Sequence, residues 1–167
     1  MTLEEFNALP EAEARSRLAA CLDVPRWVDT VVAARPFPDL GALRSVAEVA
    51  ASSMSEAELE QALARHPRIG ERAGAGHDAA ASAREQSGVD AGDRAVAERL
   101  TAGNRAYEQR FDRVFLIRAA GRDADEILAE LDRRLDNDDD TERRETIGQL
   151  AEIALLRLEE VVGPWPR

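Results

Sequence analysis

The chain of 167 residues is long enough to form one domain around a single hydrophobic core. Its 22 basic and 33 acidic residues give a formal net charge of −11, and the acids are spread along the chain, which argues against a nucleic-acid-binding surface. All 22 basic residues are arginine, so this chain cannot use lysine for Schiff-base chemistry, pyridoxal attachment or covalent biotin and lipoyl carriage.

The single cysteine, Cys21, rules out an internal disulfide and a cysteine-rich metal site. It lies among apolar positions of a predicted helix, so we expect a small buried side chain, and a nucleophilic role has little local support. The sequence MTLEEF at the start lacks the basic flank and apolar core of a signal peptide, and no apolar run approaches the roughly 20 residues that span a bilayer. We therefore expect a cytoplasmic protein without membrane association.

Helix-start signals divide the first part of the chain. Capping boxes, in which a side-chain oxygen and a carboxylate satisfy free amides of the first turn, occur at Thr2–Glu5, Ser55–Glu58 and Asp123–Glu126. Pro10 and Pro25 suit the first positions of a second and a third helix. Asp39 can cap a further helix that runs to about Ser52.

The second half predicts longer helices. Asp90 or Asp93 opens a helix that ends near Phe111. The acidic run at 136–140 lacks the glycine and the terminal glutamate of a calcium loop, so we interpret it as a solvated connection between helices. The last helix is expected from about Thr141 to Val162, before Gly163-Pro164.

The one strand-like run, Val114 to Ile117, is too isolated to build a sheet. No internal repeat or long linker interrupts the helical pattern. The sequence therefore predicts an all-α fold, a compact single-domain bundle of about eight helices that extends over residues 1–167.

Arg157 is out of place in the pattern of the last helix. At 100° per residue it falls between Leu150 and Ile153 on the apolar stripe, while Glu152 and Glu159 fall on the other side. A buried arginine needs a partner, so one interpretation is a structural ion pair or an apolar stem with its charged end in water. The other is a guanidinium that points into a pocket and binds an anionic substrate.

His66 follows a predicted helix directly and precedes Pro67, which favours an extended conformation for the histidine. A histidine displayed on a rigid turn is suited to proton transfer near neutral pH, although a plain helix-terminating loop explains the same residues. Ser82, Glu85 and Gln86 share one face of a short predicted helix. His77 lies in a stretch rich in glycine and alanine, and we interpret it as a bystander.

A metal site would have to combine His66, His77, Asp78 and Glu85. The two histidines are separated by a glycine-rich stretch instead of standing four residues apart on one helix, so we predict no metal site.

Six short motifs follow one another along the chain. They are His66-Pro67-Arg68-Ile69-Gly70, Ser82-x-x-Glu85-Gln86-x-Gly88, Asn104-x-x-Tyr107, Phe111-x-x-x-Phe115-Leu116-Ile117-x-Ala119-x-Gly121, Arg134-Leu135-x-Asn137 and Ile153-x-x-x-Arg157-Leu158. In this order they resemble the OHCU decarboxylases, which convert 2-oxo-4-hydroxy-4-carboxy-5-ureidoimidazoline (OHCU) into S-allantoin. The resemblance extends from Phe6-Asn7 to Arg157, and Asp112 stands where the family usually has glycine.

The resemblance implies an all-helical homodimer that needs no cofactor or metal. It implies that His66 is the catalytic acid or base and Glu85 its acidic partner. It further implies that a group of residues holds the ureidoimidazoline substrate, with an extended backbone run presenting amides and carbonyls: Pro67, Ser82, Gln86, Phe115, Leu116, Ile117, Ala119 and Arg157.

Two other functions stay open from the residues. A related decarboxylase or lyase could act on a different small ureido or imidazole acid, because hydroxyl, amide and backbone groups would serve many such rings. A non-catalytic helical interaction module would bind no allantoin-like ligand and would not depend on His66.

Overall fold

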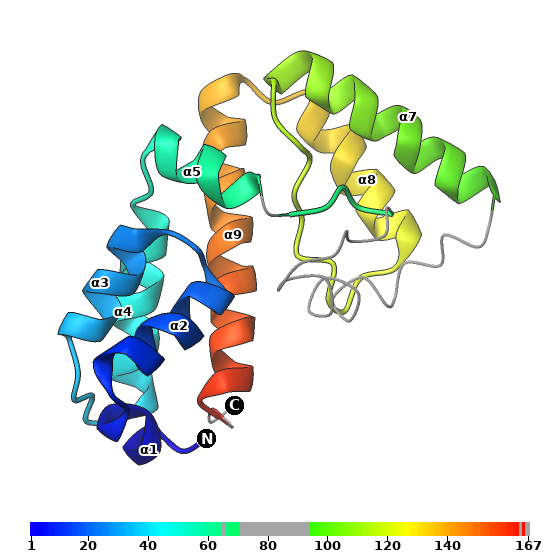
Figure 1. Cartoon of the computed structure of the whole chain (residues 1–167). Coiled ribbons are helices and arrows are strands. Elements are labelled where there is room, and N and C mark those ends of the chain that lie inside the picture. Colours follow the sequence, from blue (N-terminus) through cyan, green and yellow to red (C-terminus); the bar gives the residue numbers. More distant parts are fainter. Residues whose placement is uncertain (65, 71–93, 164, 166–167) are drawn as a thin grey trace. The chain divides into compact units, whose positions relative to one another are not determined.

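The structure, a computed structural model, describes residues 1–64, 66–70, 94–163 and 165. Within these residues the secondary structure consists of eight α-helices and no strand (Figure 1), which confirms the predicted all-α class. The chain divides into two compact units, one formed by Met1–Ala62 with Leu150–Arg167 and the other by Leu63–Gln149. The single domain over residues 1–167 stays a prediction.

The first unit contains the N-terminal helices and the C-terminal part of the last helix. α3 packs against both α2 and α4. The helices are α1 (Leu3–Ala8), α2 (Glu11–Cys21), α3 (Pro25–Ala33), α4 (Leu40–Ser52), α5 (Glu56–Leu63, whose last residue belongs to the second unit) and α9 (Asp139–Val161) from Leu150 onward.

Local capping explains where the helices of the first unit begin. The Thr2 and Ser55 boxes both form, with the Glu5 and Glu58 amides donating to the hydroxyls and the carboxylates accepting in return. Asp39 accepts from the Ala42 amide at 2.8 Å, as predicted. Pro10 differs slightly from the prediction, because its ψ of 142° is extended and α2 begins one residue later.

Trp27 is the largest fully buried side chain of the first unit. Its side chain is fully buried, and the indole N–H donates to the Ala47 carbonyl at 2.9 Å, which satisfies its one donor. Phe6, Leu18 and Leu43 are fully buried as well. Cys21 is 2% exposed, which confirms its predicted place in the core.

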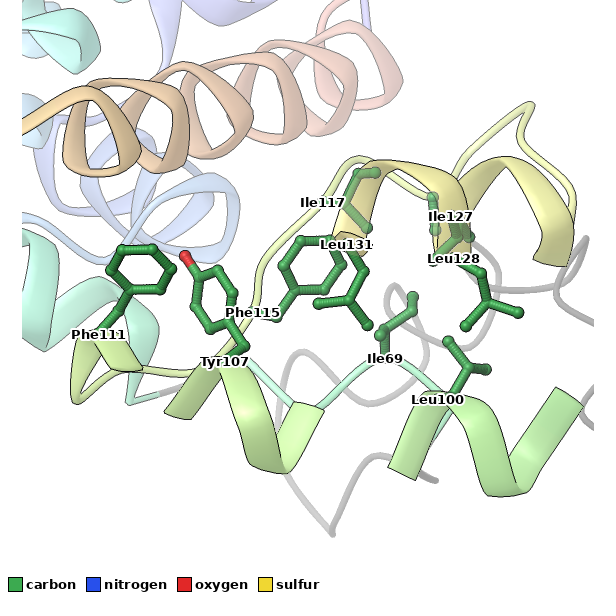
Figure 2. Packing of buried hydrophobic residues seen from close by; sticks show 10 residues of the cluster. Ile69, Leu100, Tyr107, Phe111, Phe115, Ile117, Ile127, Leu128 and Leu131 are labelled. Carbon is green, nitrogen blue, oxygen red and sulfur yellow. The ribbon is translucent and has the colours of Figure 1, made fainter. Parts of the chain in front are cut away.

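The second unit is built on α7 (Arg94–Phe111), α8 (Ala124–Leu135) and the first turns of α9. α7 packs against α8. A Cβ added at Gly103 would lie 2.3 Å from Leu131 Cδ2, so the glycine permits the close approach of the two helices. Figure 2 shows the core between them, to which Leu100, Tyr107 and Ile127 contribute.

The last helix begins two residues earlier than expected, at Asp139 instead of Thr141. The Asp138 carboxylate accepts from the Thr141 amide at 2.7 Å and acts as the cap. The acids that we assigned to the connecting loop, Asp139 and Asp140, therefore occupy the first turn, where negative charge is favourable.

Among the described helices, none has the length and apolar character that a membrane span requires.

The capping residue Glu58 gives the first unit a predicted acid sensitivity. Arg26 donates to its carboxylate at 2.7 Å, and this contact, followed by the Ser55 amide, lowers the Glu58 pKa from 4.5 to about 2. A carboxylate with a depressed pKa stabilises the fold above about pH 4.5, and the contribution disappears as the pH falls toward about 2. Glu58→Gln should remove this part of the acid dependence in chemical unfolding measured between pH 2 and 7.

The exposed Glu60 on the same helix provides the matched control. Glu60→Gln should leave the pH dependence of unfolding close to that of the unmodified chain. An unchanged profile in Glu58→Gln would contradict the assignment.

Candidate active site

The His66 loop, defined here as residues 66–70, leaves α5 with backbone contacts at both ends. The His66 amide donates to the Leu63 carbonyl at 2.9 Å. At the other end, the Asn104 side-chain amide donates to the Ile69 carbonyl at 3.0 Å, and the Ile69 side chain is buried in the core of the second unit. Gly70 follows with φ of +82°, a conformation that glycine adopts without strain.

His66 and Pro67 are both half-buried. The histidine is thus neither a fully sequestered core residue nor a freely solvated one. A partly enclosed imidazole on a fixed loop can hold a proton donor or acceptor in one direction toward a small molecule.

The backbone segment 115–119 connects α7 to α8 through an extended path. Phe115 and Ile117 are buried in the same core as Ile69 (Figure 2), and Ala119 belongs to that core as well. The isolated strand-like run therefore forms no strand, because its apolar side chains fill the helical core and no neighbouring strand is present in the described part of the chain.

Two polar side chains hold the backbone of this segment. Arg134 donates to the Leu116 carbonyl at 2.7 Å, and the Arg118 amide donates to the Gln149 side chain at 2.8 Å. The amides of Leu116 and Ile117 donate to no other residue that the structure describes. Such a segment can offer its backbone N–H groups to a polar heterocycle, whereas a helix would use these donors in its own hydrogen bonds.

The turn into segment 115–119 explains the departure from the family pattern at Asp112. Asp112 has φ of +52°, which lies in the left-handed region. Glycine adopts this conformation most easily, and aspartate tolerates it better than most residues. The chain therefore keeps the turn despite the substitution.

Arg134 forms a buried polar network at the centre of the second unit. Its side chain is 1% exposed, and that of Glu142 is 0% exposed. The Arg134 Nε donates to the Glu142 carboxylate at 2.8 Å and Nη2 donates to Thr146 at 3.1 Å. The guanidinium also lies over the Phe115 ring, 4.8 Å from its centroid.

Tyr107 and Asn137 donate further hydrogen bonds to the Glu142 carboxylate. The Tyr107 hydroxyl donates to Oε1, and the Asn137 side-chain amide donates to Oε2 at 2.8 Å. Burial, and then the Glu142 carboxylate, raise the pKa of Tyr107 above its usual range, so the phenol stays protonated as a donor.

The sequence prediction assigned no role to Arg134, although the signal was present. Arg134 follows Ile127 and Leu131 on the apolar stripe of α8, the same kind of misplaced charge that singled out Arg157. The same periodicity therefore places both arginines on the buried faces of their helices.

Arg157 is 6% exposed, which confirms that it lies on the buried face of α9. It belongs to the first unit, whereas His66, Pro67 and segment 115–119 belong to the second. Its expected contact with substrate stays a prediction.

Ser82, Glu85 and Gln86 lie outside the described residues, as do His77 and Asp78. The described residues contain no cluster of three or more potential metal ligands.

The geometry defines an all-α protein in which a half-buried histidine and a buried, non-helical stretch of backbone are fixed on one helical core. The family model for OHCU decarboxylase matches residues 7–159. The chain therefore belongs to the OHCU decarboxylase family.

Two relatives in sequence agree with this family. The chain is 29% identical over 161 residues to the 2-oxo-4-hydroxy-4-carboxy-5-ureidoimidazoline decarboxylase of Haloferax volcanii, covering 96% of this chain and 95% of that protein. It is 24% identical over 165 residues to the uric acid degradation bifunctional protein PucL of Bacillus subtilis, of which it spans 33%.

Two crystal structures share the fold. An (S)-allantoin synthase superposes with a TM-score of 0.73 at 17% identity, covering 97% of this chain and 54% of that one. An OHCU decarboxylase determined in the presence of (S)-allantoin superposes with a TM-score of 0.66 at 20% identity, covering 86% of this chain and 94% of that one.

The Arg134 network yields a stability prediction. Arg134→Met removes one member of a buried ion pair and leaves the Glu142 carboxylate uncompensated, so the free energy of unfolding should fall by about 3–5 kcal/mol. The neighbouring Arg133, which pairs with Glu130 and Glu145 at half-exposed positions, is the matched control. Arg133→Met should cost less than about 1 kcal/mol in the same urea titration. Equal losses would contradict a central role for Arg134.

Proposed function

We propose that the chain catalyses the decarboxylation of OHCU to S-allantoin and carbon dioxide, the last step of urate conversion to allantoin. The observation that carries this proposal is the family match over residues 7–159, within which the His66 loop and segment 115–119 are fixed on one core. The name of the Haloferax volcanii relative specifies the same substrate.

The substrate can act as its own electron sink. Its carboxylate stands on a carbon that also bears a hydroxyl and adjoins an imine-like carbon–nitrogen bond. When the bond to the carboxylate breaks, carbon dioxide leaves and the electron pair forms a carbon–carbon double bond in the ring. The imine electrons move to the ring nitrogen, which takes up a proton from solvent. Proton transfer to the ureido-bearing carbon, with loss of the hydroxyl proton, then gives the carbonyl of allantoin. No cofactor is needed for this electron flow.

In this mechanism His66 exchanges the proton with the hydroxyl or delivers it to the ring carbon. A proton held on one side of a planar carbon is transferred to one face, so the product has one configuration. Support comes from the half-buried position of His66 on a loop anchored at both ends. Glu85 would orient the substrate or tune the imidazole.

The remaining predicted site residues would bind the substrate without forming strong hydrogen bonds to the departing carboxylate. The amides of Leu116 and Ile117, which donate to no other residue that the structure describes, support a role of segment 115–119 in binding the ring or the ureido group. Pro67, Ser82, Gln86 and Ala119 would line the same site, and Arg157 would bind an electron-rich oxygen of the substrate. A strong bond from Arg157 to the carboxylate would stabilise the ground state and raise the barrier.

We also propose that the protein is a cytoplasmic homodimer, as the family resemblance implies. Light scattering coupled to size-exclusion chromatography should give twice the mass of the 18.3 kDa chain. A monomeric mass at micromolar concentration would contradict the dimer.

Carbon NMR of freshly generated OHCU labelled in its carboxylate tests the reaction class. Addition of the protein should accelerate conversion of the labelled carbon to carbon dioxide and bicarbonate. A panel of other ureido and imidazole acids, run in parallel, should react more slowly. Acceleration of another acid alone would favour the related lyase, and no acceleration of any acid by folded protein would favour the interaction module.

Substitution of Arg157 tests its predicted role in substrate binding. Arg157→Ala should raise KM by about tenfold or more, with a smaller effect on kcat, because the lost contact is present in both ground and transition states. Arg157→Lys, which keeps the charge, should recover part of the affinity. An unchanged KM in steady-state kinetics of folded Arg157→Ala would favour a structural role for Arg157, as an ion pair or an apolar stem with its charged end in water.

A further inference from the structure

We infer that Asn104 and Glu108 of α7 are positioning residues that fix the direction of His66 by anchoring its loop. The inference rests on the proposed function, since it assigns a catalytic task to His66. Neither residue was assigned a role in the predicted site.

One stripe of α7 contacts successive residues of the His66 loop. Leu100, Asn104 and Glu108 stand four residues apart and therefore share a face of the helix. Leu100 lies beneath Gly70, where an added Cβ would come within 3.1 Å of Leu100 Cδ1. Asn104 donates to the Ile69 carbonyl at 3.0 Å.

Glu108 anchors the next residue toward His66. The Arg68 guanidinium donates to both Glu108 oxygens, Nη2 to Oε2 at 2.9 Å and Nε to Oε1. This fork-to-fork contact fixes the plane of the arginine side chain as well as its position. The stripe therefore contacts Gly70, Ile69 and Arg68 in turn and runs toward the catalytic histidine.

The burial of Asn104 indicates that its hydrogen bond serves more than packing. Asn104 is 4% exposed within an apolar helix face, and its Oδ1 accepts no hydrogen bond from the residues that the structure describes. A buried amide with an unsatisfied acceptor is unfavourable compared with leucine of similar size. A purely structural position would favour the apolar residue, whereas a position that must hold the Ile69 carbonyl requires the donor.

The anchors act on His66 through a short and stiff piece of backbone. The His66 amide is bound to the Leu63 carbonyl, and only Pro67 and Arg68 separate His66 from the Ile69 carbonyl that Asn104 holds. Proline fixes its own φ, so few backbone torsions remain to vary. Loss of the Ile69 anchor should therefore turn the imidazole away from its working direction while the substrate still binds.

Kinetics and NMR of Asn104→Leu test the inference directly. Misplacement of a proton-transfer group by about 1 Å can cost up to about 100-fold, so kcat should fall by about 10- to 100-fold. KM should change by less than about threefold, because the positioning residue does not touch the substrate. The chain has two histidines, so a His77→Gln background leaves the His66 imidazole as a single resonance whose shift and pH titration should both change.

Asn7 provides the matched control in the other unit. Its side-chain amide donates to the Phe37 carbonyl at 2.9 Å and its oxygen accepts from the Phe37 amide at 2.9 Å, so it too holds a loop backbone. Asn7→Leu should lower stability without moving the His66 resonance or its titration. If both variants alter His66 equally, the effect is general loosening and the inference is wrong.

Glu108→Ala keeps the test decisive if Asn104→Leu does not fold. Glu108 lies at a partly exposed position, and its loss should change kcat and the His66 resonance in the same direction by a smaller factor. An unchanged kcat and an unchanged imidazole titration in the folded variants would overturn the inference. If His66→Gln itself keeps full activity, the proposed catalytic role fails, whereas the NMR response still decides whether the stripe positions the loop.

Discussion

The ion pair between Arg134 and Glu142 is the interaction on which the second unit depends. It joins α8 to the first turn of α9, and Arg134 reaches on to the Leu116 carbonyl while Tyr107 of α7 donates to the same carboxylate. Two charges buried this deeply are tolerated only because nearly every polar atom around them finds a partner. The network thereby fixes three helices and one irregular backbone segment in a single arrangement, which apolar packing alone would specify less strictly.

Helix α7 connects that network to the proposed catalytic residue. Tyr107 packs against the rings of Phe111 and Phe115, and one turn earlier on the same buried face Asn104 holds the His66 loop. The loop that carries the histidine and the segment proposed to bind substrate through its backbone therefore pack against the same helix. For a reaction in which the substrate accepts its own electrons, such fixed geometry is the principal contribution that a protein can make.

Much of this fold could be predicted from local patterns, and the limits of the prediction have physical causes. Capping boxes and apolar periodicity located the helices because both depend on residues within one or two turns. The start of α9 was misplaced because acids that look like loop residues are also favourable in a first helical turn. Periodicity also placed Arg157 in the interior, yet the partners of a buried arginine depend on distant segments. The contacts of Arg134 with Leu116 and Glu142 illustrate this, since no spacing rule relates these three positions.

The stereochemistry of the product tests the central claim most directly. Protonation of a planar ring carbon without the protein has no preferred face, so spontaneous decay of OHCU yields racemic allantoin. Circular dichroism of allantoin formed from fresh OHCU should show rapid appearance of the S enantiomer with the unmodified chain, and an inactive racemate at the spontaneous rate with His66→Gln. A racemic product at the spontaneous rate from folded, unmodified protein would contradict the account, and S-allantoin at full rate from His66→Gln would remove His66 from the mechanism.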